Sequence, residues 1–289
     1  MCAVSNMADK TADKTMDIQR QTLVRVEGLR KSYERGSFWS RHKNLIALRD
    51  VDLEIAEGSS MALVGESGSG KSTLARCLAR MEEPTGGEIW FDGQNLLTLR
   101  GEVLFRVRCE IQLVFQDSAT ALNPRFSAEE IISEPLAIQG ESAKKRKQVA
   151  TEWMERIGLP GAWLQRRPHV FSGGQRQRLA IARALVIQPR LLILDEALAG
   201  LDLSVQAQIV NLLLNLQTWN GLTCLYISHD LGLMGAIADE IAVMHDGQIV
   251  ERQTTRQLFA YPQHIVTQGL LAAIPGRNLD DSAPEQIAP

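Results

Sequence analysis

The stretch SMALVGESGSGKSTLA, residues 60–75, decides the fold. Its first five residues form a nearly unbroken apolar run that stops at a glycine, which is typical of a strand covered on both faces. The next eight residues match the pattern GxxxxGK[ST] at every position, and the sequence from Thr73 onward continues as a helix. A strand, a glycine-rich loop and a helix in this order predict a cradle for phosphate groups. The alternative, a glycine-rich turn without a ligand, is disfavoured by this setting.

Each polar group of the predicted phosphate loop has an expected role. The glycines let backbone N–H groups turn toward phosphate oxygens, and the N-terminus of the helix adds a favourable dipole. Lys71 neutralises the β- and γ-phosphates, and Ser72 offers its hydroxyl to magnesium. The residues predicted to bind the nucleotide here are Gly65, Glu66, Ser67, Gly68, Ser69, Gly70, Lys71, Ser72 and Thr73.

A second apolar strand, residues 191–194, is followed by two carboxylates, Asp195 and Glu196. Asp195 would hold magnesium directly or through water, and Glu196 is placed to polarise the attacking water. By itself, an acidic pair after a strand is as often a solvated turn. The phosphate loop upstream requires an acidic magnesium partner, however, and this pair supplies it.

The third motif is a small-residue helix start at residues 172–175, Ser172-Gly173-Gly174-Gln175, with Ser172 as the predicted cap of an amphipathic helix. The free N–H groups at such a start form a second anion site. A chain with one phosphate loop has no evident use for another cradle in the same site. We therefore predict that this motif serves the nucleotide held by a partner subunit.

Composition limits the classes of protein that remain. With 45% hydrophobic and 22% charged residues, the 289-residue chain can bury the core of one large domain or of two closely joined lobes. The formal net charge of -3 gives no basic field for nucleic acid, so we expect no such partner. The cysteines lack metal-ligand or disulfide spacing, and no apolar stretch approaches the roughly 18 residues of a membrane span. We expect a chain that is soluble by itself.

The order of elements predicts an α/β fold. An alternating pattern over residues 23–55 predicts antiparallel strands that open the protein as a β lobe. Apolar strands at 60–64, 191–194 and 223–227, separated by helical sequence, predict a mostly parallel core sheet wrapped by helices. In such a sheet the ligand site lies at the carboxyl ends of the strands.

Two further patterns complete this organisation. The charged, helical stretch at about 98–170 predicts an inserted helical subdomain, in which a capping box from Ser127 to Glu130 starts one helix. The turn at Asp246 and Gly247, between two short apolar runs, predicts a β-hairpin.

In this order and spacing, the three motifs resemble those of ABC transporter ATP-binding subunits, and the resemblance covers about residues 23–275. It implies a P-loop ABC ATPase with a RecA-like parallel-sheet core, an N-terminal antiparallel β lobe and an inserted helical subdomain. It also implies ATP and Mg2+ as cofactors and hydrolysis of ATP to ADP and phosphate. We expect a disordered leader at 1–20, the ATPase domain at 21–275 and a flexible tail at 276–289.

The resemblance also assigns roles that the residues alone do not give. Gln116 looks like the Q-loop glutamine, which senses magnesium and the γ-phosphate. Tyr33 looks like the aromatic residue that stacks on adenine, and Asp202 resembles the D-loop aspartate. His229, just past a buried strand, looks like the switch histidine that contacts the γ-phosphate. Taken singly, residues of these types more often have packing or hydrogen-bonding roles, so the assignment depends on their order and spacing.

The implied catalytic residues are Glu196, His229, Gln116 and Lys71, and the implied magnesium ligands are Ser72, Gln116 and Asp195. One departure from the family pattern follows Glu196. The family commonly has a proline and a small polar residue there, whereas this chain has Ala197-Leu198-Ala199-Gly200. No catalytic group is lost, but we expect a less rigid turn.

Within the family, residues 114–125, 203–208 and 270–275 resemble the peptide and nickel importer ATPases. This likeness implies two membrane permeases, a sister ATPase subunit that is a different chain, and an external solute-binding protein. It implies a peripheral location at the cytoplasmic face of the inner membrane. The face at residues 123–134 is expected to meet the permease.

Two alternatives and one choice of solute stay open at this point. A soluble ABC ATPase of a cytosolic complex, such as one for phosphonate cleavage, would carry the same motifs. A regulatory module with dead sites is disfavoured because Lys71, Asp195, Glu196 and His229 are all present. The short tail and the insert at 36–44 resemble the nickel-type subunits and favour nickel slightly over peptides.

Overall fold

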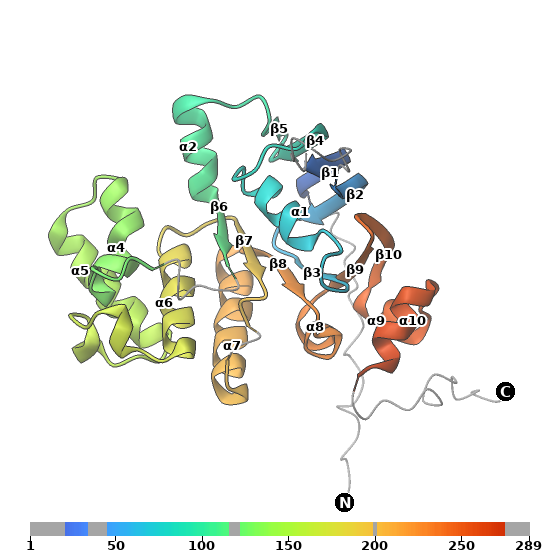
Figure 1. Cartoon of the computed structure of the whole chain (residues 1–289). Coiled ribbons are helices and arrows are strands. Elements are labelled where there is room, and N and C mark those ends of the chain that lie inside the picture. The colour runs from blue at the N-terminus through green and yellow to red at the C-terminus, as the bar shows by residue number, and fades with distance from the viewer. Residues whose placement is uncertain (1–20, 34–44, 116–121, 199–200, 275–289) are drawn as a thin grey trace, which may run out of the picture.

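The structure is a computed structural model that describes residues 21–33, 45–115, 122–198 and 201–274 (Figure 1). The predictions for the leader at 1–20, for the tail at 276–289 and for Gln116 lie outside these residues. The described elements form an antiparallel sheet, a mostly parallel sheet and a group of helices at one end of the molecule.

The N-terminal lobe is a four-stranded antiparallel sheet, as the alternating pattern predicts. Its strands are β1 (Thr22–Tyr33), β2 (Leu45–Ala56), β4 (Gly86–Phe91) and β5 (Gln94–Asn95), in the order β2-β1-β4-β5. Along β1, Val24 and Val26 are buried while Arg25 and Glu27 are exposed, because successive side chains of a strand point to opposite faces.

The core is a six-stranded sheet in the order β10-β9-β3-β8-β7-β6. The strands are β3 (Ser60–Val64), β6 (Ile111–Val114), β7 (Leu191–Asp195), β8 (Thr223–Ser228), β9 (Glu240–His245) and β10 (Gln248–Thr254). All neighbours pair in parallel except β9 and β10, which form the predicted hairpin. Every residue of β3, β7 and β8 is buried, which confirms the prediction of strands covered on both faces.

Helices cover the core sheet and extend beyond it at one end (Figure 1). They are α1 (Lys71–Leu78), α2 (Gly101–Glu110), α4 (Ala128–Ile138), α5 (Ala143–Arg156), α6 (Gly173–Leu185), α7 (Leu203–Asn220), α8 (Leu231–Ile237), α9 (Thr255–Ala260) and α10 (Ile265–Ala272). Both hydrogen bonds of the predicted capping box are present at the start of α4. Helices α4, α5 and α6 pack against one another, so the charged region does form a helical layer.

Strand β6 lies within the stretch at about 98–170 that is predicted as an inserted helical subdomain, and the sequence did not indicate it. It pairs in parallel with β7 at the edge of the core sheet, and its Ile111 and Val114 are buried. The backbone N–H of Arg190 donates to the carbonyl of Glu110 at 2.9 Å, which starts this pairing. A four-residue strand is too short for its periodicity to stand out among charged helices. The division into core and helical subdomain stays a prediction.

Arg190 fastens the β lobe to the core just before β7. Its guanidinium lies 2.6 Å from a carboxylate oxygen of Glu57 and 2.7 Å from one of Asp92. The hydrogen bond to Asp92 raises the pKa of Arg190, and the same bond holds the pKa of Asp92 below its usual value. The start of β7 is therefore tied to the antiparallel sheet, and its end carries the predicted acidic pair.

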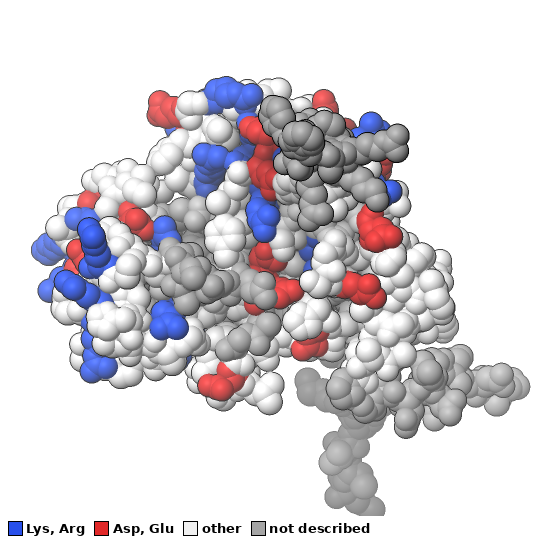
Figure 2. Space-filling view, viewed as in Figure 1, with Lys and Arg blue, Asp and Glu red and all other residues white. Residues whose placement is uncertain are grey.

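Among the described residues, no helix is long and apolar enough to cross a membrane. Figure 2 shows Lys and Arg gathered over the helical end of the visible face. Helix α5 contributes to this charge, since its sequence AKKRKQVATEWMER contains five basic and two acidic residues. On this face, basic side chains are thus concentrated at the helical end.

Candidate active site

The predicted phosphate loop joins β3 to α1, and packing requires two of its glycines. A Cβ added at Gly65 would lie 2.1 Å from the carbonyl oxygen of Met244, and one added at Gly70 would lie 2.5 Å from that of Ala47. Met244 belongs to β9 and Ala47 to β2, so the loop packs directly against both sheets. Close backbone packing therefore requires glycine at these two positions, in addition to the predicted role in phosphate binding.

Lys71 lies inside this loop with only 5% of its surface exposed. Its ammonium group donates to the carbonyl oxygens of Gly65 and Glu66, each at 2.7 Å. Burial lowers the pKa of Lys71, and the nearby carboxylates of Glu196 and Asp195 oppose that effect. The loop thus holds one cation at the place where the pattern predicts the β- and γ-phosphates.

Ser72 and Asp195, predicted as magnesium ligands, meet across the site. The hydroxyl of Ser72 donates to a carboxylate oxygen of Asp195 at 3.0 Å, although 123 positions separate them in sequence. Burial raises the pKa of Asp195, and the bond from Ser72 only partly opposes this. A hydroxyl and a carboxylate are the hard oxygen ligands that Mg2+ takes, with water and phosphate oxygens completing the shell. Among the described residues no cluster of three His, Cys, Asp or Glu offers another metal site.

Glu196 and His229, predicted as catalytic residues, also lie together. A carboxylate oxygen of Glu196 lies 3.6 Å from Nδ1 of His229. Glu196 has a φ of 49°, in the left-handed region that non-glycine residues rarely adopt. Its backbone N–H donates to the carbonyl of Ile227 at 2.9 Å, which holds this conformation against β8. The side chain of Glu196 is 20% exposed and that of His229 is 64% exposed, so the pair faces the surface of the site.

Tyr33 stands at the end of β1 and contacts α1. Its hydroxyl lies 3.4 Å from the hydroxyl of Thr73, the residue after the predicted magnesium ligand Ser72. Burial raises the pKa of Tyr33, so the phenol stays protonated at neutral pH. The structure therefore brings the predicted adenine-stacking residue to the helix that begins at the phosphate loop.

The motif at residues 172–175 forms the start of α6, as predicted. The side chain of Ser172 accepts from the N–H of Gln175 at 3.3 Å, and the side chain of Gln175 accepts from the N–H of Ser172 at 2.9 Å. A Cβ added at Gly174 would lie 3.3 Å from Leu201, so this start packs beside the predicted D-loop. Asp202 is the exposed N-cap of α7 and makes no capping bond with its side chain.

Two groups of predicted site residues thus occupy different elements. Lys71, Ser72, Asp195, Glu196 and His229 gather at the carboxyl ends of β3, β7 and β8. Among the described residues, no hydrogen bond or ion pair joins them to residues 172–175 or to Asp202. The placement of Gln116, and of residues 199–200 in the turn after Glu196, lies outside the described ranges.

Comparison with known proteins decides the family. The sequence model of the ABC transporter family matches residues 48–199. A dipeptide transport ATP-binding protein of Haemophilus influenzae is 43% identical over 265 residues, which cover 90% of this chain and 81% of that relative. The chain belongs to the ABC transporter family. A putative peptide import ATP-binding protein of Brucella ovis is 44% identical to this ABC ATPase over 266 residues, which cover 92% of the chain and 82% of that relative.

Solved structures share the fold of this ABC ATPase. A dimeric ATP-binding cassette, in a post-hydrolysis state bound to ADP and phosphate, matches with a TM-score of 0.74 and 30% identity over 81% of this chain and 99% of that one. A subunit of an ABC transporter complex from Clostridium perfringens matches with a TM-score of 0.71 and 28% identity over 88% of this chain and 96% of that one. The predicted fold class and the predicted ATPase family are confirmed.

Sequence reasoning missed three features of the site. It did not find the bond between Ser72 and Asp195, the left-handed backbone of Glu196, or the contact of Lys31 with the ring of Tyr33. Each depends on residues that are brought together by the fold. Only Lys31 had a sequence signal, because a lysine two positions before an aromatic residue lies on the same face of a strand.

Proposed function

We propose that this ABC ATPase drives a membrane importer of peptides by binding and hydrolysing ATP. The observation that carries the proposal of ATP hydrolysis is that two pairs of side chains lie near Lys71. Ser72 and Asp195 form one pair at 3.0 Å, and Glu196 and His229 form the other at 3.6 Å. A phosphate cradle, two oxygen ligands and a carboxylate beside a histidine are the parts that ATP hydrolysis requires.

Each residue then has a role in the reaction. The loop N–H groups and Lys71 bind the β- and γ-phosphates and neutralise their charge. Ser72 and Asp195 would hold Mg2+, which when bound neutralises charge on the transferred phosphoryl group. Glu196 accepts a hydrogen bond from the attacking water and so polarises it, and His229 contacts the γ-phosphate. We include Gln116 in this set on the family resemblance alone.

The start of α6 requires a partner subunit in this scheme. The N–H groups of Gly173 and Gly174 would bind the γ-phosphate of ATP held by the sister subunit, beside Asp202 of the predicted D-loop. Two subunits then close head to tail on two ATP molecules, and hydrolysis reopens them. The relation to a dimeric cassette that holds ADP and phosphate supports this arrangement.

An apolar groove supports docking of a permease. A cavity of about 380 Å³ lies between α2, β6, α4 and α6, with Phe105, Val114, Ile138 and Arg183 in its lining. Phe105 is 43% exposed and Ile138 is 64% exposed, although both are large and apolar. The groove adjoins the C-terminal end of the predicted face at 123–134. A helix of the permease would cover these side chains and turn opening and closing of the ATPase into movement of the permease.

The names of the relatives favour peptides over nickel as the solute. Two of them are named for dipeptide or peptide import, whereas the preference for nickel depended on a short tail and an insert that lie outside the described residues. Deleting the gene and measuring growth on dipeptides beside uptake of radioactive nickel tests the choice. Lost growth on dipeptides with normal nickel uptake would support peptides, and the reverse result would restore nickel.

The assembly is part of the same proposal. We infer a sister ATPase that is a different chain, two permeases and an external solute-binding protein, with this subunit at the cytoplasmic face of the inner membrane. Co-purification from detergent extract tests it, because an importer subunit should bring membrane permeases with it. Recovery with soluble proteins alone would favour the cytosolic complex instead, such as one for phosphonate cleavage.

A further inference from the structure

Strand β1 carries a lysine that lies against the proposed adenine platform. The ammonium nitrogen of Lys31 lies 5.1 Å from the centroid of the Tyr33 ring, over its face. A cation at this distance is attracted by the electron-rich face of the ring. Lys31 therefore occupies one face of Tyr33, and a base can stack only on the other face.

Lys31 is itself held in place by the turn that follows α1. Its ammonium nitrogen lies 3.2 Å from a carboxylate oxygen of Glu82, and the two side chains are only 14% and 19% exposed. It also donates to the carbonyl of Glu83 at 2.7 Å. A free lysine side chain loses rotamer freedom when it forms a contact, but this one is already ordered. The cation is thus preorganised against the ring.

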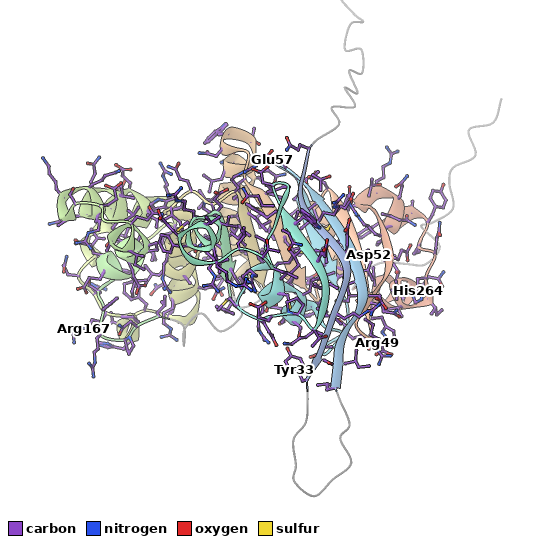
Figure 3. All side chains as sticks on the ribbon, turned by 90° about the horizontal axis from the view of Figure 1, so that it is seen from above. Tyr33, Arg49, Asp52, Glu57, Arg167 and His264 are labelled. Carbon is purple, nitrogen blue, oxygen red and sulfur yellow. The ribbon has the colours of Figure 1, made fainter. Side chains whose placement is uncertain are left out.

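The side chain of Tyr33 also contacts helix α1 itself. Its hydroxyl lies 3.4 Å from the hydroxyl of Thr73 in the first turn of α1. Lys31 contacts Glu82 and Glu83 in the turn that follows that helix. In Figure 3, Tyr33 lies at the opposite end of the antiparallel lobe from Glu57, at the last residue of β1. Contacts with the first turn of α1 and with the turn after that helix therefore set where the ring stands relative to the phosphate loop.

We propose that Lys31 is a positioning residue of the nucleotide site, which orients the ring of Tyr33 for stacking with the adenine base. This inference rests on the proposed function, because it takes Tyr33 as the residue that meets the base. Without Lys31 the covered face of the ring is open, and the side chain of Tyr33 is held only at its hydroxyl, by Thr73 and Glu82. Affinity for ATP should then fall about three- to tenfold, while affinity for a triphosphate without a base should not change.

The test compares two ligands on four full-length variants in the presence of Mg2+. ATP and inorganic tripolyphosphate are titrated against the wild type, Lys31→Met, Lys31→Arg and Arg25→Met. Methionine keeps the length of the lysine stem without its charge, and arginine can both cover a ring and pair with a carboxylate. Arg25 is the matched control, since it lies on the same strand with its guanidinium 5.7 Å from the centroid of the Trp90 ring.

We expect Lys31→Met to weaken binding of ATP but not of tripolyphosphate, Lys31→Arg to restore ATP binding, and Arg25→Met to leave both unchanged. A double variant separates positioning from general support of the fold. If Lys31 acts through the ring, Lys31→Met should add no further loss to Tyr33→Leu. Lys31→Gln removes the charge but keeps a polar side chain that can donate to the carbonyl of Glu83, so it covers a Lys31→Met chain that does not fold and should weaken ATP binding in the same direction.

The opposite results overturn the inference in distinct ways. Equal loss for ATP and tripolyphosphate, or equal loss in Arg25→Met, would show that Lys31 supports the sheet and not the base. Unchanged ATP binding in both Lys31→Met and Lys31→Gln would show that the ring needs no such support. A wild-type chain that binds neither ligand would instead contradict the proposed function.

Discussion

Replacing Asp195 with asparagine should raise stability while removing activity. The carboxylate is 5% exposed and accepts a hydrogen bond from Ser72. Burial raises the pKa of Asp195 above its value in the unfolded chain, so ionising it in the folded protein has a net cost. That cost is absent below the unfolded pKa of about 3.9, grows as the pH rises through the folded pKa, and is complete above it.

The neutral amide removes this cost without changing the shape of the side chain. Its oxygen can still accept the hydroxyl of Ser72, so the local contact survives. We expect Asp195→Asn to raise the free energy of unfolding at pH 7 by about 0.5–2 kcal/mol, as is common when a charged active-site residue is neutralised. Each kcal/mol corresponds to a rise in Tm of roughly 2–4 °C for a chain of this size. ATP hydrolysis should fall at least about 100-fold, because a metal ligand is lost.

Asp92→Asn is a matched control with the opposite sign. In the wild type, the hydrogen bond from Arg190 lowers the pKa of Asp92 in the folded protein. Ionised Asp92 therefore stabilises the fold above the unfolded pKa, and this contribution is lost as the pH falls through the folded pKa. The variant should therefore lower Tm at pH 7 and leave ATP hydrolysis near the wild-type rate. The effect should be small because the side chain of Asp92 is 36% exposed.

Thermal unfolding followed by circular dichroism, with phosphate release as the activity assay, measures both effects. The gain in Tm from Asp195→Asn should shrink when the pH is lowered toward 4, where the wild-type carboxyl takes up its proton. A Tm that falls at pH 7 as it does for Asp92→Asn would refute the reasoning, because the buried charge would then be net stabilising. A gain of the same size at every pH would refute it too, since it would not come from ionisation.

Three further predictions follow from the site. Glu196→Gln should keep ATP binding, slow hydrolysis by about two or more orders of magnitude and trap a closed dimer, because it removes polarisation of the attacking water but leaves the phosphate cradle intact. Near-normal turnover in the assembled transporter would contradict this role. Ser172→Arg or Gly174→Asp should abolish transport without weakening ATP binding by the isolated subunit, and equal loss of affinity in a binding titration would show that the motif acts within its own chain. Gly65→Ala should lower the free energy of unfolding by about 1–3 kcal/mol, because the added Cβ would lie 2.1 Å from a backbone oxygen of β9. A Cβ added at Gly269 in α10 meets nothing within 4 Å, so Gly269→Ala should not destabilise the chain in the same denaturant titration.

Local patterns were sufficient to predict the elements that carry the site. The strand, the loop and the helix around Lys71 follow from the apolar run, the glycines and the helical sequence. Each of these signals depends only on residues that are close together in the sequence. The capping box at Ser127 is likewise complete within four residues, and both of its bonds are present in α4. The ligand site was then predicted at the carboxyl ends of the buried parallel strands. The fold class and the common location of most of the predicted catalytic residues could be derived in this way.

Features that depend on distant residues could not be predicted. The bond between Ser72 and Asp195 joins positions 123 apart, and no periodicity reports it. Strand β6 exists because Ile111 and Val114 are buried against the core beside β7, although the surrounding sequence is helical and charged. The left-handed backbone of Glu196 is likewise favoured by a partner on another strand rather than by its own residue type.

The register of the core sheet explains why Glu196 and His229, the predicted catalytic pair, lie together. Asp195 of β7 pairs with Ile227 of β8, and the carbonyl of Ile227 accepts the N–H of Glu196. His229 follows two residues later, so one strand end supplies both the acceptor for the backbone of Glu196 and the histidine beside its side chain. Strand β8 also pairs with β3, where Leu63 lies opposite Ile227 just before the phosphate loop. A slip of β8 by one residue would therefore displace His229 from the carboxylate of Glu196 and shift the strand that lies beside the start of the phosphate loop.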